Sequence, residues 1–264
     1  MDADEIRHRF EETGVIRMDA AFTPDEAAAM RDVIWRYAHH KAGVRFDDPS
    51  TWPEGAYPGV SWKGLKRNRA FLPLIENAAL LTALEAIFGV GGWTPPKPGA
   101  QVLCTLPQPG PWVLPDAWHM DCGFEKSTWP VFAVKLFAFF GEVGPEGGGT
   151  MVLPGSHRLV DRYRTKLPPG TGGGKTNWRP FMKHDPWLAQ LLEGKRMPDG
   201  GRSLVGQTRE IDGIPVEVTE LTGWPGDVVL THLHIFHTAS PNTGPQPRQM
   251  LGKAISAQET PAQV

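Results

Sequence analysis

The sequence predicts an α+β domain whose centre is a β-sandwich or barrel. Helical segments occupy the first third of the 264 residues, and short β-rich runs between turns follow after Gly99. Glycine (30 residues) and proline (26 residues) are abundant, which favours turns and irregular loops over a helical bundle. Hydrophobic residues make up 40% of the chain and include 12 Phe and 10 Trp, so a sizeable core can be buried and most of the chain is expected to fold.

The N-terminal third carries clear helix boundaries. Helices are expected over residues 4–13, from the cap at Thr23 to about His39, and over residues 77–88. Gly14 and Gly89 end the first and the last of them, while Thr23 and Glu26 form a capping box around Pro24. A short strand is expected over residues 15–18, and the segment 42–69, rich in Gly, Pro and Trp, is expected to be a long loop.

Short strands dominate the rest of the chain. They are expected over residues 131–140, 216–219, 227–230 and 250–257. The first of these segments is almost entirely apolar, which is typical of a strand buried on both faces. Between residues 154 and 213 lies a long insertion rich in Gly, Pro and basic residues, with one short helix expected near residues 187–192.

Charge and cysteine content exclude several classes of protein. The 27 basic and 29 acidic residues give a formal charge of −2, so the chain lacks the basic footprint of a general nucleic-acid binder. Two cysteines cannot cross-link a chain of this length, which favours a reducing compartment. The acidic N-terminus does not resemble a signal peptide, and no apolar run reaches the roughly 18 residues that span a bilayer. We therefore expect a soluble cytoplasmic protein without a nucleic-acid or membrane partner.

Residues 170–176 resemble a phosphate-binding P-loop. The P-loop pattern requires a glycine where Pro169 stands, and it requires a strand before the loop and a helix after it. Pro168 precedes the segment and Pro180 soon follows it, so a surface loop is the expected structure.

Trp118-His119-Met120-Asp121 is the first segment with a chemical signature. Side chains at positions i and i+2 of a strand point to the same face, so His119 and Asp121 could converge on one point. Taken alone, the pair is equally compatible with a histidine that only hydrogen-bonds a neighbouring carboxylate. A second cluster contains His232, His234 and His237. One histidine from this cluster would complete a facial triad, which suits non-haem Fe(II) and leaves positions open for a co-substrate and O₂.

Arg248 follows His237 by 11 residues. A guanidinium can clasp a carboxylate through two parallel hydrogen bonds. A dicarboxylic oxoacid bound to a metal at one end would need such a clamp at its other end. The order of histidine, aspartate, distal histidine and arginine therefore favours an oxygenase that uses such a co-substrate.

On these residues the chain resembles the phytanoyl-CoA dioxygenase-like family of Fe(II)/2-oxoglutarate-dependent oxygenases. The resemblance rests on residues 118–121, on residues 146–157 with the turn Pro154-Gly155-Ser156-His157, and on residues 226–248. It implies a double-stranded β-helix (jelly roll, cupin-like) core with flanking N-terminal helices. It also implies a single domain over residues 1–264, with a helical part over about 1–98 and a core over about 99–258 that carries the inserted loop of about 154–213.

The resemblance also assigns roles to individual residues. The implied iron ligands are His119, Asp121 and His237. Arg248 would hold the far carboxylate of 2-oxoglutarate. His232 matches a family position that is often histidine but is not a ligand, and His234 is the alternative ligand. Asp121 stands where related halogenases have a small residue, which favours oxygenation or another oxidation over halogenation.

The implied activity is oxidation of an unactivated C–H bond in a small-molecule substrate, with hydroxylation as the default outcome. O₂ and 2-oxoglutarate would be consumed, succinate and CO₂ released, and ascorbate is expected to support turnover. Desaturation, cyclisation and epimerisation use the same oxidant. The alternatives are a non-catalytic jelly-roll protein that binds a ligand and a cupin-type metal-dependent isomerase or lyase, and neither gives Arg248 a role in binding 2-oxoglutarate. The sequence leaves the substrate and the oligomeric state open.

Further candidates surround the implied ligands. Gln101, on the strand expected before the metal motif, could reach 2-oxoglutarate or the substrate, or be an ordinary strand glutamine. Thr238 follows the distal histidine, where the family often has Gly-Ser, and is a candidate contact of 2-oxoglutarate. Candidate substrate contacts are Met120, Trp62 and Lys63. Cys122 is expected to be a buried structural thiol that points away from the metal face, and His157 is expected to support the fold.

Overall fold

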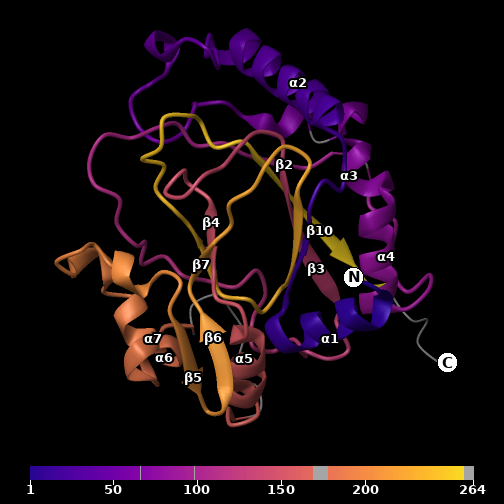
Figure 1. The fold of residues 1–264 in the computed structure, drawn as a ribbon, viewed down its shortest axis with the longest axis vertical. Coiled ribbons are helices and arrows are strands. Elements are labelled where there is room, and N and C mark those ends of the chain that lie inside the picture. Colours follow the sequence, from indigo (N-terminus) through magenta and orange to yellow (C-terminus); the bar gives the residue numbers. More distant parts are fainter. Residues whose placement is uncertain (66, 98, 169–177, 259–264) are drawn as a thin grey trace.

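The computed structural model describes residues 1–65, 67–97, 99–168 and 178–258, so the loop expected over residues 170–176 lies outside the described residues. Two antiparallel sheets face each other, and helices lie outside them (Figure 1). The larger sheet has the spatial order β1 (Val15–Met18), β8 (Val228–His232), β3 (Ala133–Phe139), β10 (Met250–Ser256) and β2 (Gln101–Leu103). The smaller sheet has the order β7 (Thr219–Glu220), β4 (Thr150–Val152) and β9 (His237–Ala239). This is the predicted jelly-roll architecture.

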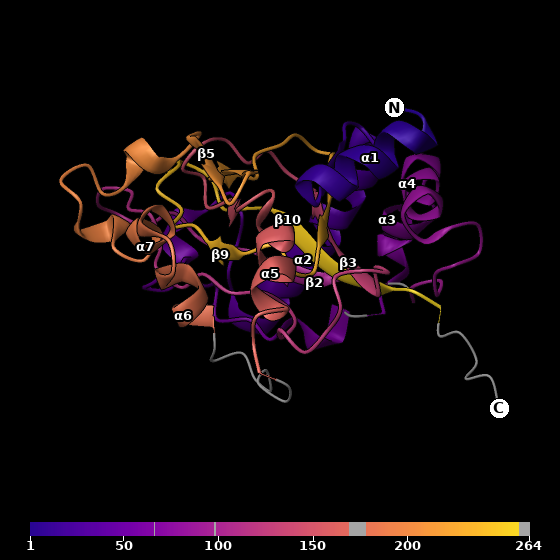
Figure 2. The ribbon, with the colours of Figure 1, turned by 90° about the horizontal axis from the view of Figure 1, so that it is seen from below.

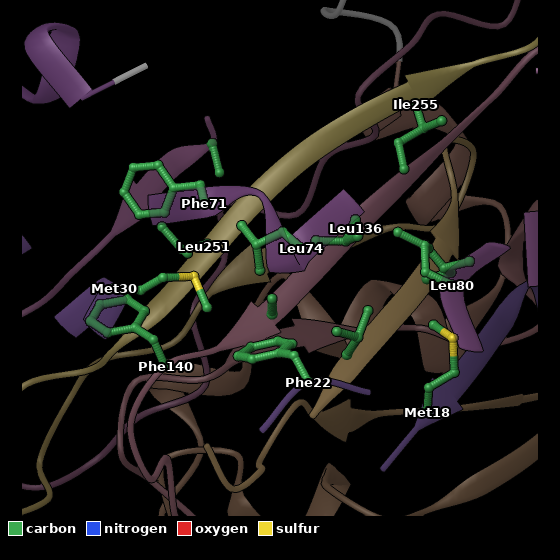
Figure 3. Close-up of a cluster of buried hydrophobic side chains, with 14 of the residues drawn as sticks. Met18, Phe22, Met30, Phe71, Leu74, Leu80, Leu136, Phe140, Leu251 and Ile255 are labelled. Atoms are coloured by element: carbon green, nitrogen blue, oxygen red, sulfur yellow. The ribbon is translucent and has the colours of Figure 1, made fainter. Parts of the chain in front are cut away.

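Helices from the N-terminal third cover the outer face of the larger sheet (Figure 1). They are α1 (Ala3–Thr13), α2 (Pro24–Ala42), α3 (Pro73–Glu76) and α4 (Ala78–Phe88). Because side chains alternate along a strand, Val134, Leu136 and Ala138 of β3 all belong to the core beneath these helices. Figure 3 shows part of this core, in which Met30 from α2 and Leu80 from α4 pack with side chains of the sheet.

Local signals determine where the first helices begin and end. The predicted capping box is confirmed, since the Thr23 side chain accepts from the N–H of Glu26 and the Glu26 carboxylate accepts from the N–H of Thr23 at 2.7 Å. Gly14 ends α1 with φ +70°, and a Cβ at this position would lie 2.7 Å from Nδ1 of His157. Glycine is therefore required here both by the backbone conformation and by the close approach of the imidazole.

A second layer covers the outer face of the smaller sheet, with α6 and α7 on the side away from α1 and α4 and α5 next to α1 (Figure 2). It contains α5 (Ser156–Arg164), α6 (Trp178–Lys183), α7 (Pro186–Leu191) and a hairpin of β5 (Thr208–Ile211) and β6 (Ile214–Glu217). Phe181 of α6 stacks on Phe236, with ring centroids 4.9 Å apart and an interplanar angle of 5°. The prediction of a loop over residues 154–213 with one short helix is therefore wrong. The helices are too short to show a clear periodicity, yet their apolar side chains build a core of their own.

Other boundaries differ from the prediction in detail. Single 3₁₀ turns occur at η1 (Pro49–Thr51), η2 (Trp62–Leu65), η3 (Arg69–Phe71), η4 (Gly194–Arg196) and η5 (Arg202–Leu204). The first two interrupt the segment 42–69 that was predicted as a loop. The single strand predicted over residues 216–219 is divided, because β6 pairs with β5 in the hairpin while β7 pairs with β4 in the smaller sheet.

No single helix among the described residues has the length and apolar character needed to cross a membrane. Arg69–Glu76 and Ala78–Phe88 meet that requirement only as a pair, and a bend of 54° separates them. The cytoplasmic location expected from the sequence stays a prediction.

Truncation of Leu136 to alanine should lower the free energy of unfolding by about 2–5 kcal/mol, because this β3 side chain is completely buried in the core beneath the helices. Urea-induced unfolding followed by circular dichroism measures the change. Val90→Ala is the matched control: Val90 is 89% exposed, so this variant should differ from the wild type by less than about 0.5 kcal/mol. A loss below about 1 kcal/mol in Leu136→Ala would contradict the described packing.

Candidate metal centre

Backbone hydrogen bonds hold His119 and His237 side by side. The N–H of each residue donates to the carbonyl of the other, and both distances are 2.9 Å. Since β9 is the edge strand of the smaller sheet, His119 extends that sheet by one residue. The strand expected around His119 and Asp121 is therefore only an isolated bridge, and Asp121 lies in a bend. Proline cannot donate to a β-ladder, and four prolines lie between β2 and His119: Pro107, Pro109, Pro111 and Pro115.

The structure brings His119, Asp121 and His237 to one point. Their candidate ligand atoms all lie within 4.8 Å of one another, and no other group of this kind occurs in the part of the chain that the structure describes. Oδ1 of Asp121 lies 3.8 Å from Nε2 of His237, and the two imidazole centroids are 4.4 Å apart. All three residues are half-buried, which leaves the cluster accessible from one side.

The main chain orients both imidazoles in the same way. Nδ1 of His119 lies 3.0 Å from the carbonyl oxygen of Ala117, and Nδ1 of His237 lies 3.0 Å from that of Ile235. Because a carbonyl oxygen can only accept, Nδ1 must carry the proton in each ring. Nε2 of each ring is then the nitrogen with a free lone pair, as a metal ligand requires. Burial lowers the pKa of His237 below its ordinary value and favours this neutral form.

Asp121 supplies the negative charge of the cluster. Burial by itself would raise the pKa of this carboxyl, but the neighbouring groups, Lys135 among them, outweigh burial and the pKa is lowered. Nζ of Lys135, on β3, lies 3.2 Å from Oδ2 of Asp121. The carboxylate is thus ionised at neutral pH and paired with an ammonium group.

The donor set fits Fe(II). Two neutral imidazoles and one carboxylate on one side of a metal form the facial arrangement that non-haem Fe(II) sites use, and the opposite side stays open for other ligands. Structural zinc sites, by contrast, prefer four closed ligands rich in thiolate or imidazole, and neither Cys104 nor Cys122 joins this cluster.

Arg248 is held rigidly before β10. Its side chain is buried, with Nε donating to the carbonyl of Leu103 at 3.1 Å and Nη1 donating to that of Gly148 at 2.7 Å. Burial lowers the pKa of Arg248 to about 10, so the guanidinium is still cationic at neutral pH. Two of its donors are used by backbone carbonyls, which fixes the plane in which the remaining N–H groups can bind a carboxylate.

A cavity of about 570 Å³ adjoins Arg248. Its lining includes Gln101 of β2, Ala239 of β9, and Tyr57 and Trp62 from the segment between α2 and α3. Ala239 is two residues after His237 and therefore points to the same face of β9 as this histidine. The structure thus brings Gln101, Trp62 and Arg248, which the sequence singled out separately, to one cavity, and Ala239 connects its wall to the strand that carries His237.

Two charged residues near the centre were missed from the sequence. Glu220 on β7 accepts from the N–H groups of Glu146 at 2.7 Å and Gly149 at 3.0 Å, and burial raises the pKa of Glu220 to about 7. The sequence offers no pattern that would distinguish Glu220, in a strand of two residues, from any other glutamate. Lys135 could have been noticed, because it is the only charged residue in the apolar segment 131–140.

The other predicted contacts lie elsewhere. Thr238 is buried and alternates to the face of β9 opposite His237, so Ala239 and not Thr238 lines the cavity. Met120 is buried in the hydrophobic cluster of the second helical layer, and Lys63 is exposed outside the cavity lining. Cys122 is half-buried, which corrects the expected full burial, and burial raises the pKa of its thiol to about 12.

His157, His232 and His234 form a separate buried cluster. Ring centroids are 5.1 Å apart for His157 and His232, and 5.2 Å apart for His232 and His234. Nδ1 of His232 accepts from the N–H of His234 at 3.1 Å, so Nε2 of His232 donates to the carbonyl of Thr128 at 3.0 Å. Burial lowers the pKa of His157 to about 3 and those of His232 and His234 to about 4. His234 therefore belongs to this cluster and not to the triad.

Stability should fall as the pH drops below about 6.5, because the unfolded chain binds protons at these histidines while the folded chain does not. The loss should end near pH 4 to 3, where the folded protein also binds them, and each histidine contributes at most about 1.4 kcal/mol per pH unit. Urea unfolding between pH 4 and 7 measures the slope. His157→Gln should reduce it by about 1 kcal/mol per pH unit, whereas replacement of the exposed His8 by Gln should not. Equal slopes in wild type and His157→Gln would refute this account.

Removal of one triad side chain should weaken metal binding by roughly a hundredfold or more, because two remaining ligands cannot hold a divalent ion firmly. Visible absorption of added Co(II) measures the affinity in His119→Ala and Asp121→Ala. His40→Ala serves as the control, because His40 is exposed at the end of α2. Unchanged Co(II) affinity in both triad variants would show that the metal binds elsewhere.

Comparison with known proteins agrees with this geometry. The family described as phytanoyl-CoA dioxygenase (PhyH) matches residues 10–250, and no curated protein sequence matches the chain. The epimerase SnoN, crystallised with Fe³⁺, alpha ketoglutarate and nogalamycin RO, is similar with TM-score 0.55 and 15% identity over 99% of this chain and 87% of its own. AviO1 from Streptomyces viridochromogenes Tue57 is similar with TM-score 0.50 and 17% identity over 98% of each chain. These structures share the jelly-roll fold, and because the family match spans most of the sequence, the chain belongs to the phytanoyl-CoA dioxygenase (PhyH) family.

Proposed function

We propose that this protein is an Fe(II)- and 2-oxoglutarate-dependent oxygenase that oxidises a C–H bond of a small molecule. The observation that carries the proposal is the convergence of His119, Asp121 and His237, together with the buried Arg248 in a cavity whose wall includes Ala239 of the strand that carries His237. Bound Fe(II) and 2-oxoglutarate would supply oxidation of the substrate by O₂, with release of succinate and CO₂. The family membership and the Fe³⁺ and alpha ketoglutarate bound in SnoN support this assignment.

Each residue of the centre has a distinct task in this proposal. The Nε2 atoms of His119 and His237 and the carboxylate of Asp121 hold the metal on one side. Arg248 binds the distal carboxylate of 2-oxoglutarate, and its bonds to backbone carbonyls keep the guanidinium in place. Gln101 lines the same cavity and can donate to a ligand there through its amide.

The oxidised substrate could leave the enzyme either hydroxylated or epimerised. We expect hydroxylation as the default, with ascorbate supporting turnover. The similarity to SnoN makes epimerisation the second candidate, because that enzyme is an epimerase with the same type of co-substrate. A hydroxylated product gains one oxygen atom from O₂, whereas an epimerised product has an unchanged mass, so mass spectrometry of the product separates the two.

Addition of 2-oxoglutarate to the Fe(II) protein without O₂ should produce a weak visible absorption band, because the oxoacid chelates the metal. Arg248→Lys keeps the charge but loses the planar fork, and should weaken 2-oxoglutarate binding about tenfold or more while the metal still binds. Asp121→Ala should abolish both the band and the release of succinate under Fe(II), ascorbate and O₂. A wild-type protein without the band, or succinate release that persists in Asp121→Ala, would favour a ligand-binding jelly roll or a cupin-type isomerase or lyase.

A further inference from the structure

Lys135 is placed inside the jelly roll by strand alternation. On β3, Val134, Leu136 and Ala138 belong to the core beneath the helices, so Lys135 and Phe137 point into the space between the sheets. Phe137 lies next to His237, with ring centroids 6.4 Å apart. A lysine in the middle of a buried strand is costly unless its charge has a partner, so its presence requires an explanation.

The side chain of Lys135 lies beside Asp121 and close to Leu103, a residue of the cavity wall. Its Nζ is 3.2 Å from Oδ2 of Asp121, and 18% of the side chain is exposed. A Cβ built at Gly252 would lie 3.5 Å from Cε of Lys135 and 3.1 Å from Cδ1 of Leu103. Leu103 lines the cavity together with Arg248. The absence of a side chain at Gly252 therefore leaves room for the end of the lysine stem near a residue of the cavity wall.

The charges around the metal explain what the ammonium group would bind. In the metal-free protein Lys135 neutralises Asp121. Oδ1 of Asp121 faces His237 and would be the atom that binds a divalent metal, while Oδ2 keeps its contact with the ammonium group. The two positive charges of the metal would be balanced by this carboxylate and by the chelating carboxylate of 2-oxoglutarate, so the positive charge of Lys135 would be left without compensation. Buried charges are stable only when they are paired, so an additional anion is expected there.

We propose that Lys135 binds an anionic group of the substrate, a carboxylate or a phosphate, beside the metal. The substrate class is then a small anionic molecule, held by its charge so that the C–H bond near that charge faces the open side of the metal. This inference rests on the proposed function and adds the recognition of the substrate to it. Arg17, on β1 of the same sheet, is not expected to bind the substrate anion, because it is already paired with Asp227.

The experiment uses the protein loaded with Co(II) and 2-oxoglutarate, with benzoate as the anionic probe and benzamide as its uncharged counterpart. The visible Co(II) spectrum measures the affinity for both. Benzoate should bind the wild type at least tenfold more tightly than benzamide. Lys135→Gln should remove this preference, Lys135→Arg should retain part of it, and Lys183→Gln, which removes an exposed lysine of α6, should leave it unchanged.

The affinity for 2-oxoglutarate separates the two possible sources of the anion. If Lys135 binds the substrate, Lys135→Gln should bind 2-oxoglutarate within about twofold of the wild type. A loss of tenfold or more in 2-oxoglutarate affinity would assign the lysine to the co-substrate and overturn the proposal. Equal affinities of wild type for benzoate and benzamide would overturn it as well. Failure of the proposed function is distinguishable, because the wild-type Co(II) protein would then not bind 2-oxoglutarate at all.

Discussion

In β3 every side chain points either to the N-terminal helices or into the space between the two sheets, and this alternation sorts the molecule into its layers. Leu136 and its helix-facing neighbours build the larger core. Lys135 and Phe137, on the other face, reach the metal centre. The same rule on β9 places His237 and Ala239 toward the cavity and Thr238 away from it. A shift of one residue in either strand would exchange these roles and destroy the core and the centre together.

The metal centre forms where regular structure ends. β9 is the edge of the smaller sheet, and a single bridge attaches His119 to it. Each imidazole is oriented by the carbonyl oxygen two residues earlier in the chain, so its protonated nitrogen is fixed locally. The local hydrogen bonds set the orientation of each ring, and packing between the sheets brings the two rings and the carboxylate together. Three metal ligands can therefore be positioned accurately even though Asp121 lies outside regular structure.

Two carboxylates of the interior are paired with cations. Arg17 binds Asp227 at one end of the larger sheet, and Lys135 faces Asp121 at the metal centre. Arg248 instead donates to backbone carbonyls, and the nearby Glu220 has a raised pKa. Arg248 is thus the buried cation best placed to receive an external carboxylate, while the charge of Lys135 would lack compensation only when a metal binds Asp121. The two cations would therefore bind different molecules: Arg248 would hold the co-substrate and Lys135 an anionic group of the substrate.

The sequence by itself determined the features that depend on neighbouring residues. The capping box at Thr23, the end of α1 at Gly14, and the order of His119, Asp121, His237 and Arg248 could all be read from short segments, and with them the family and the fold. The tertiary structure alone showed that His119, Asp121 and His237 meet while His232 and His234 pack with His157, revealed the layer of α5, α6 and α7, and placed Lys135 beside Asp121. Spacing along the chain cannot decide these points, because they depend on which faces of distant strands meet, and that is settled by packing over the whole domain.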